Sequence, residues 1–285
     1  MSPASPSALA DVAGLLACPE CRLGLEAVDR ALRCDRGHNF DIAKQGYVSL
    51  LTGASTKMTG DTAAMLDARA AFQGEGHFAP IADAVATAVG PVDDRSASLL
   101  EIGAGTGYYL AAALDAAPNA RGVAIDVAKP AARRCARAHP RAAAVLADAW
   151  RGLPVRDGVL TGVLSVFAPR NPAEVARVLD ADGRFVVAAP TARHLGELID
   201  PLGMVTVDPD KDRRITEAMS GLFEPVERVA VKYSMKLDHA AVAQVVGMGP
   251  SAHHAENARD PRLATLPEQL EVTASVTVST YRPRR

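Results

Sequence analysis

The sequence predicts an α/β protein with a doubly wound, largely parallel sheet and a small zinc-ribbon module in front of it. Two observations support this fold class. An apolar run ending near Glu101 is followed directly by Gly103, Gly105 and Gly107 and then by a helical pattern, which forms the first strand–turn–helix unit of such a sheet. Near the N-terminus, three cysteines and one histidine follow the spacing C-x2-C-x12-C-x3-H, which is typical of a small zinc module.

Chain length and composition fit one large domain with a small appendage, because 285 residues is close to the size at which a single core stops growing. We expect a disordered tail rich in Ser, Pro and Ala over residues 1–14, the zinc module over 15–51, a connecting segment over 52–80 and the main domain over 81–285. No run approaches ~20 apolar residues and no basic leader precedes an apolar stretch. A cytoplasmic protein without a membrane partner is therefore expected.

The charge balance excludes a uniformly basic coat for nucleic acid, since the formal net charge is −2. The first 60 residues hold equal numbers of basic and acidic residues, namely Arg22, Arg30, Arg33, Arg36, Lys44 and Lys57 against Asp11, Glu20, Glu26, Asp29, Asp35 and Asp41. Residues 129–137 are more basic, but a solvated helix is favoured there over an RNA-binding patch. Any RNA partner must be held by local patches.

The cysteine cluster predicts a structural zinc site with Cys18, Cys21, Cys34 and His38 as ligands. Two short strands, residues 23–28 and 31–33, are expected between the two pairs. Four protein ligands close the tetrahedral shell and leave no open position for water or substrate, which argues against a catalytic metal. The alternative is a set of isolated buried thiols with a surface histidine. The fourth cysteine, Cys135, lies on a predicted helix and is interpreted as a small core residue.

The glycine turn discriminates between cofactors. A dinucleotide-binding turn would need glycine at position 108, where the sequence has tyrosine, whereas the pattern E-x-G-x-G-x-G resembles the first motif of class I methyltransferases with their Rossmann-like sheet. The next strand ends in Asp126, whose carboxylate could accept hydrogen bonds from two ribose hydroxyls, and the third strand ends in Asp148, our candidate for the adenine amine. The glycines alone are weak evidence, because tight turns often need glycine for backbone reasons.

Further strands and helices extend this pattern. A fourth strand is predicted over residues 159–167, a helix over 172–179 and a fifth strand over 185–189. A helix is expected from His194 toward Ile199, in which His194 could equally be an ordinary surface residue. Residues 226–231 and 272–281 are expected to be antiparallel closing strands. Residues 247–254 are expected to be a loop without metal-ligand spacing.

Over nearly its full length the chain resembles the bacterial 23S rRNA (guanine-N1)-methyltransferases, in particular the branch associated with tylosin and mycinamicin resistance. The segments that carry the resemblance are the zinc cluster and residues 40–51, 68–70, 76–80, 101–109, 166–172, 193–195, 232–235 and 248–251. The sequence Met-Gly-Pro-Ser at residues 248–251 favours the tylosin-resistance branch over the sister branch, which modifies a nearby guanine in the same hairpin.

The resemblance implies an enzyme that transfers methyl from S-adenosylmethionine to guanine N1 in a domain II hairpin of 23S rRNA, with resistance to tylosin-type macrolides. It implies that the four cysteine and histidine ligands bind zinc, and that Phe78, Tyr109, Leu110 and His194 contact the methyl donor. Other members have tyrosine where this chain has Phe78, so ring packing is retained and a hydroxyl contact is lost. A homodimer is also implied. Neither the resemblance nor the residues assign a general base.

Two other functions remain open at the level of sequence. A class I methyltransferase acting on a small molecule would use the same sheet, with the zinc module as a lid. A non-catalytic zinc protein that binds RNA would keep a vestigial donor site. The intact set of Glu101, the three glycines and Asp126 argues against this third interpretation.

Overall fold

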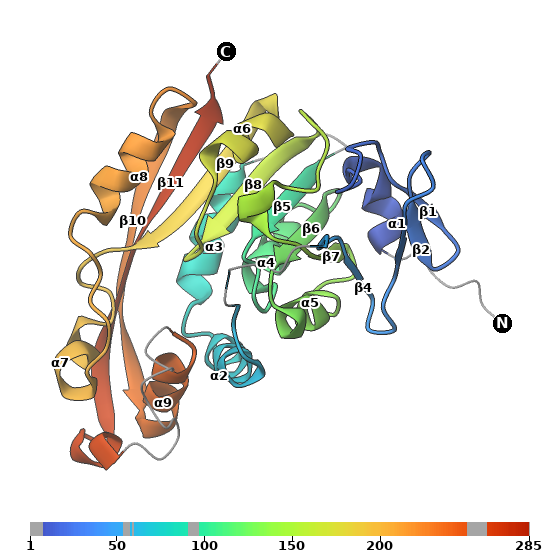
Figure 1. The fold of residues 1–285 in the computed structure, drawn as a ribbon. Coiled ribbons are helices and arrows are strands. Elements are labelled where there is room, and N and C mark those ends of the chain that lie inside the picture. The colour runs from blue at the N-terminus through green and yellow to red at the C-terminus, as the bar shows by residue number, and fades with distance from the viewer. Residues whose placement is uncertain (1–7, 54–57, 59, 91–96, 250–260, 285) are drawn as a thin grey trace.

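The fold is seen in a computed structural model, which describes residues 8–53, 58, 60–90, 97–249 and 261–284. Its centre is an eight-stranded sheet with the order β10-β11-β9-β8-β5-β6-β7-β4 (Figure 1). The strands of this sheet are β4 (Tyr47–Ser49), β5 (Ser98–Ile102), β6 (Arg121–Asp126), β7 (Ala142–Leu146), β8 (Leu160–Val166), β9 (Leu179–Pro190), β10 (Phe223–Asp238) and β11 (Gln269–Pro283).

The sheet is parallel from β4 to β9 and antiparallel at the other end, where β11 pairs with β9 and β10 pairs with β11. Both closing strands were predicted, although each is longer than expected. The chain builds outward from β5 to β6 and β7, then returns to the opposite side of β5 as β8 and β9. Ligands of doubly wound sheets bind at such a reversal, beyond the carboxyl ends of the strands. The predicted doubly wound α/β class is confirmed.

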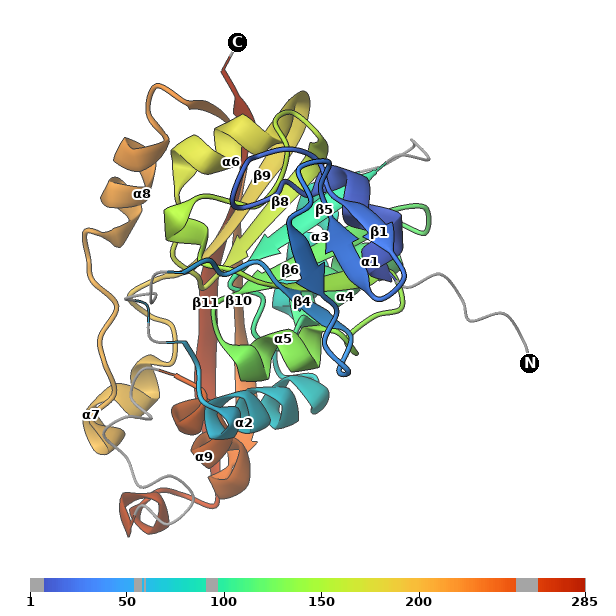
Figure 2. The ribbon, with the colours of Figure 1, turned by 45° about the vertical axis from the view of Figure 1, so that its right-hand side comes forward.

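Helices cover both faces of the sheet (Figures 1 and 2). The α-helices are α1 (Ala8–Val12), α2 (Ala63–Gly74), α3 (Ala79–Val89), α4 (Tyr108–Ala116), α5 (Lys129–Cys135), α6 (Pro172–Val178), α7 (Ile199–Leu202), α8 (Lys211–Met219) and α9 (His239–Gly247). Short 3-10 helices lie at Ala13–Leu15, Ala149–Arg151, Gly196–Leu198 and Pro261–Thr265.

The two cores follow the two-residue repeat of the strands. On β5, Leu99 packs into the core beneath α3 and α4, while Leu100 and Ile102 face the other core. On β9, Val186 faces the first core, and Phe185 faces the second, which includes residues of α6, α8 and the zinc module. The zinc module and the main sheet therefore share one hydrophobic core.

The N-terminal module contains a three-stranded antiparallel sheet of β1 (Glu26–Val28), β2 (Ala31–Arg33) and β3 (Asn39–Asp41). The first two strands were predicted, and the third was not. The next strand, β4, leaves this small sheet and pairs in parallel with β7 at the edge of the main sheet. The segment that we assigned to the zinc module by sequence thus also contributes a strand to the main sheet.

Two expectations from the sequence differ from the structure. The expected tail through residue 14 is helical from Ala8 onward, because Leu9 and Val12 are buried against the main domain. The helix expected from His194 does not form there, since Leu195 adopts a left-handed conformation with φ of 56° and a short 3-10 helix follows. Of the expected loop at 247–254, residues 250–254 lie outside the described residues. Within the described residues, no helix is both long and apolar enough to cross a bilayer.

Candidate functional site

The structure brings the four predicted zinc ligands together. The Cys18 and Cys34 sulfurs lie 3.5 and 3.3 Å from His38 Nδ1, and the Cys21 and Cys34 sulfurs are 3.6 Å apart. All four ligand atoms lie within 4.8 Å of one another. Tetrahedral zinc with ~2.3 Å bonds to sulfur separates its ligands by about 3.7 Å, so the cluster fits this ion without rearrangement.

Two tight turns place the zinc ligands. The Arg22 amide donates a hydrogen bond to the Cys18 carbonyl at 2.8 Å, and the Gly37 amide donates to the Cys34 carbonyl at 2.8 Å. Gly37 has a φ of 83°, which favours glycine. One turn holds Cys18 and Cys21 close together, and the other holds Cys34 and His38. The two pairs of ligands that are close in the sequence therefore face each other in space.

The glycine turn lies at the reversal of the main sheet, between β5 and α4. Gly103, Gly105 and Gly107 have φ values of 66°, 57° and 79°, which non-glycine residues rarely adopt. A Cβ at Gly103 would lie 2.8 Å from the Ala168 Cβ, so a side chain there would collide with the loop after β8. The backbone conformation and the close approach of neighbouring residues therefore both require glycine in this turn.

The predicted acids lie at the ends of the strands around this turn. Glu101 is buried and accepts a hydrogen bond from the Leu110 amide at 3.0 Å, and burial raises the pKa of its carboxyl to about 8. Asp126 accepts bonds from the Gly105 and Ala128 amides at 2.9 and 2.8 Å. Each Asp126 oxygen keeps a further lone pair for a ligand hydroxyl.

Asp148 follows β7 and begins a 3-10 helix as its N-cap. Its side chain accepts a hydrogen bond from the Trp150 amide at 3.0 Å, which fixes the carboxylate next to the strand end. The side chain is buried, with 7% of the residue exposed. Asp126 is the last residue of β6, and Asp148 lies two residues beyond the end of the neighbouring strand β7. Both acids thus lie at the carboxyl ends of adjacent strands, and their adenosine roles stay predictions.

A cluster of rings closes the other side of the site. The Phe167 ring stacks on His194 with centroids 5.6 Å apart and planes 19° apart. Phe78 lies 5.9 Å from His194 and 6.1 Å from Phe167, and Tyr109 lies 6.3 Å from Phe167. The Tyr109 hydroxyl is buried and has no hydrogen-bond partner among the described residues, which leaves a polar group available to a ligand. Leu110 is fully buried between α4 and β6, with its methyl groups next to Gly122.

His194 is held as a neutral donor. Its Nδ1 accepts a hydrogen bond from the Ser275 amide at 3.1 Å, so the ring proton is on Nε2. Burial, together with the positive charge of Lys211, lowers the pKa of His194 to about 4. The side chain therefore carries no charge at neutral pH and offers one N–H.

This depressed pKa predicts acid-dependent stability. The unfolded imidazole has a pKa near 6.5, so between pH ~6.5 and ~4 the unfolded state binds more protons and the free energy of unfolding falls as the pH falls. We expect His194 to contribute a loss of about 3 kcal/mol across this range. Urea titrations of wild type and His194→Gln at pH 7 and pH 4.5 measure it. An equal loss in both proteins would contradict the assignment.

Comparisons with known proteins identify the family to which the chain belongs. Residues 16–55 match the family model for the N-terminal zinc ribbon of RlmA, and residues 100–187 match a methyltransferase domain model. A putative 23S rRNA (guanine-N(1)-)-methyltransferase of Micromonospora griseorubida is 46% identical, and the alignment covers 94% of this chain and 97% of that protein. The chain belongs to the 23S rRNA (guanine-N1)-methyltransferase family.

A second curated relative agrees with this membership. The 23S rRNA (guanine(748)-N(1))-methyltransferase of Streptomyces fradiae is 44% identical over 96% of this chain and 98% of its own length. Among solved structures, a putative type II methyltransferase from Anaeromyxobacter dehalogenans matches 70% of this chain and 95% of its own, with 17% identity and a TM-score of 0.49. The methyltransferase domain has S-adenosylmethionine as its donor, and the zinc ribbon with its Cys3His cluster has a structural zinc ion.

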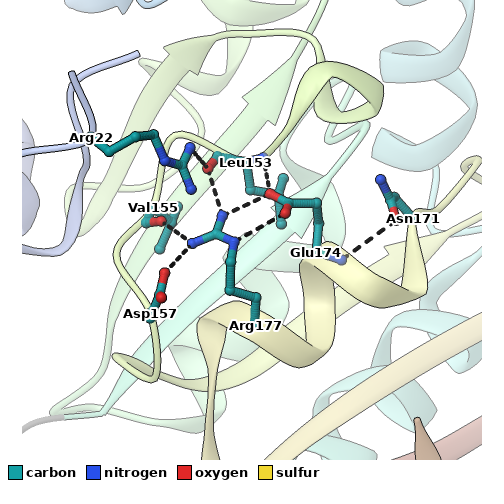
Figure 3. A network of polar contacts seen from close by, with 7 residues as sticks. All are labelled: Arg22, Leu153, Val155, Asp157, Asn171, Glu174 and Arg177. Atoms are coloured by element: carbon teal, nitrogen blue, oxygen red, sulfur yellow. Dashed lines mark hydrogen bonds and ion pairs between the residues drawn. The ribbon is translucent and has the colours of Figure 1, made fainter. Parts of the chain in front are cut away.

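In this family member, a polar network ties the zinc module to the segment before β8 and, through it, to α6 (Figure 3). Arg22, in the first zinc turn, donates to the Leu153 carbonyl at 3.2 Å, and Arg177 of α6 donates to the same carbonyl at 2.9 Å. Arg177 also pairs with Glu174 at 2.7 Å and with Asp157 at 2.6 Å. Because α6 begins at Pro172, directly after the loop that carries Phe167, this network holds the zinc module and that loop in one arrangement.

Loss of Arg177 is expected to destabilise the protein. An Arg177→Met variant leaves Glu174 and two backbone carbonyls without their charged donor, so we expect the free energy of unfolding to fall by about 2 to 3 kcal/mol. Arg213→Met is the matched control, because Arg213 is 59% exposed and its pairs with Asp210 and Glu217 are on the surface. Chemical denaturation measures both, and equal effects would contradict a special role for the network.

Sequence reasoning did not single out Phe167, Arg177 or Arg69. Arg69 on α2 pairs with Asp61 at 2.6 Å and donates to the Met248 carbonyl at 2.8 Å, so it joins two distant segments beside the glycine turn. Phe167 could have been found from the sequence, because it is an aromatic residue directly after a buried strand. Arg69 and Arg177 each have one partner close by in the sequence, Asp61 and Glu174. Their contacts to Met248 and Leu153, which join separate segments, span 179 and 24 positions and carry no signal in the sequence.

Proposed function

We propose that this protein methylates N1 of a guanine in a domain II hairpin of 23S rRNA, at the position that the name of the Streptomyces fradiae relative numbers 748. The observation that carries the proposal is the identity of 44 to 46% over nearly the whole chain, which includes the zinc module as well as the donor site. If the chain methylated a small molecule, its sequence similarity to rRNA methyltransferases would not need to include the zinc module as well as the methyltransferase domain. The proposal includes resistance to tylosin-type macrolides, a cytoplasmic location and a homodimer.

The donor site is assigned residue by residue within this proposal. S-adenosylmethionine supplies an electrophilic methyl group on its sulfonium. Asp126 would accept the ribose hydroxyls, and Asp148 would accept from the adenine amine. The turn at Gly103, Gly105 and Gly107 lets a ligand approach the backbone closely, and Glu101 fixes this turn by holding the first turn of α4 through the Leu110 amide.

The ring cluster of Phe78, Tyr109 and His194 would enclose the reacting end of the donor. Near-attack geometry supplies most of the catalysis in an in-line methyl transfer, so a rigid, buried wall on this side is the contribution that the chain makes. His194 adds one N–H donor without adding charge, because it stays neutral. The Tyr109 hydroxyl supplies a second polar contact.

The guanine must leave its stack to reach this site, and Phe167 offers it a new stacking partner. Phe167 directly follows β8, has 37% of its surface exposed and adopts a φ of 54°, which is strained for a phenylalanine. Strain of this kind persists where the surrounding structure enforces it, and it concentrates at functional sites. The exposed ring, backed by His194, provides a flat apolar face next to the donor site.

A primer-extension assay tests the proposed function. Purified protein is incubated with labelled S-adenosylmethionine and 23S rRNA that lacks modifications, and modified bases are mapped by reverse transcription. Methylation at N1 blocks the Watson–Crick edge, so we expect one strong stop in the domain II hairpin that depends on the methyl donor. Absence of a stop in that hairpin would overturn the proposal. Tylosin sensitivity of a susceptible host with and without the gene tests the resistance, and sedimentation tests the homodimer.

A further inference from the structure

A cavity of about 190 Å³ lies beside the donor site, where β9 ends and α8 packs against the outer strands of the sheet. Its lining includes Pro190, Thr191, Asp208, Lys211, Asp212 and Arg228. The Thr191 hydroxyl is 2.8 Å from that of Ser275, whose amide donates to His194. The cavity is therefore linked to His194 of the ring cluster through Thr191 and Ser275.

Most charges around the cavity are already neutralised. Arg228 pairs with Asp212 at 2.8 Å, and Arg214 pairs with Asp208. The Lys211 ammonium has no hydrogen bond or ion pair with any residue that the structure describes. Burial, followed by the positive charges of Arg170 and Arg214, lowers the pKa of Lys211, while Asp208 acts in the opposite direction. Lys211 is thus the cation in the lining whose charge is left uncompensated.

A second cation, Arg170, lies within electrostatic reach of Lys211. Arg170 belongs to the loop after β8, three residues beyond Phe167, and donates to the Ala168 carbonyl at 2.9 Å. Its Nε is buried and has no hydrogen-bond partner in the described part of the chain. Lys211 and Arg170 are both partly buried, and the charge of Arg170 disfavours the charged form of Lys211. An anion in the cavity would compensate for this, because an unpaired buried charge is costly.

We propose that the cavity under α8 binds a backbone phosphate of the acceptor RNA strand through Lys211, while Arg170, outside the lining, adds positive potential from the loop after β8. The inference rests on the proposed function, since it supplies the RNA contact that the balanced charge of the zinc module does not. Extruding a guanine rotates its nucleotide about the backbone, so a neighbouring phosphate must be held while the base stacks on Phe167. Lysine and arginine are the side chains that bind phosphate at such sites.

The test compares Lys211→Gln with wild type on a synthetic hairpin RNA that contains the target guanine. We expect KM for the RNA to rise about tenfold at low salt, while kcat and the Kd for S-adenosylmethionine change less than twofold. The logarithm of the RNA-binding constant falls with the logarithm of the salt concentration, and each phosphate contact on a single strand contributes about 0.7 to the steepness of this fall. Loss of one contact in Lys211→Gln should therefore make the dependence shallower by about 0.7. Lys236→Gln removes the same charge from an exposed site on β10 outside the cavity and should leave the slope unchanged.

A chemical change in the RNA provides an independent arm. Neutral methylphosphonates are introduced one at a time at the phosphates that flank the guanine, and one of them should weaken binding to wild type but not to Lys211→Gln. An unchanged salt slope in Lys211→Gln would overturn the phosphate site. The phosphate site would also be overturned if Lys211→Gln lowered kcat and shifted its pH profile while the salt dependence of RNA binding stayed unchanged. Lys211 would then contact the guanine base rather than a phosphate. Failure of wild type to methylate any hairpin would instead refute the proposed function.

Discussion

An Asp126→Ala variant is expected to bind S-adenosylmethionine about 100-fold more weakly than wild type, which corresponds to about 3 kcal/mol. The carboxylate lies at the end of β6 and accepts hydrogen bonds from the Gly105 and Ala128 amides. Truncation therefore removes both the proposed contacts to the ribose hydroxyls and the bond that holds the glycine turn. Each lost hydrogen bond to a charged group costs about 1.5 to 3 kcal/mol. Isothermal titration with the methyl donor measures the change directly.

Asp115→Ala is the control for this experiment. Asp115 lies at the exposed end of α4, with its side chain 76% accessible and paired with His139. Its loss removes the same charge and the same number of atoms without touching the glycine turn, so donor affinity should stay within twofold of wild type. A donor affinity in Asp126→Ala equal to that of the control would remove Asp126 from the site and leave the ribose contact to another residue.

The parts of the site that the sequence predicted are those fixed by local geometry. The zinc ligands fall in two pairs on tight turns, and Glu101, the three glycines and Asp126 belong to consecutive strand–turn–helix units. In each case, the backbone between the residues is short and regular, so spacing along the chain determines separation in space. The doubly wound fold and the zinc ribbon were predicted for the same reason.

Residues whose roles depend on distant contacts could not be predicted. Arg22 and Leu153 are separated by 131 positions, and Thr191 and Ser275 by 84, yet each pair forms a hydrogen bond. The N-terminal helix also depends on tertiary contacts, because a composition rich in Ser, Pro and Ala gives no hint that Leu9 is buried. His194 was placed on a helix because nothing local marks the left-handed Leu195, which turns the ring toward Phe167.

A Cys34→Ser variant is expected to lose its zinc and at least 100-fold of its RNA-methylation activity while it keeps most of its donor affinity. Binding of a structural zinc contributes directly to folding, with values on the order of 10 kcal/mol in isolated zinc modules, and loss of one thiolate forfeits much of this. Cys34 lies within hydrogen-bond range of both Cys21 and His38, so the remaining three ligands lose their shared partner. Zinc content by native mass spectrometry and rRNA methylation measure the two effects.

Cys135→Ser separates zinc loss from the general effect of replacing a buried thiol. Cys135 is fully buried, and its sulfur lies 3.4 Å from the Gly105 carbonyl, outside the zinc cluster. This control should therefore retain one zinc per chain. A parallel collapse of donor affinity and RNA methylation in Cys34→Ser would mean that the zinc module supports the whole sheet, through the shared core and β4, and the proposed division into an RNA-facing module and a donor-binding sheet would be wrong. Retained donor affinity would show instead that the donor site keeps its structure without the zinc ion, because the residues assigned to the donor come from elements that fold around β5 and β6.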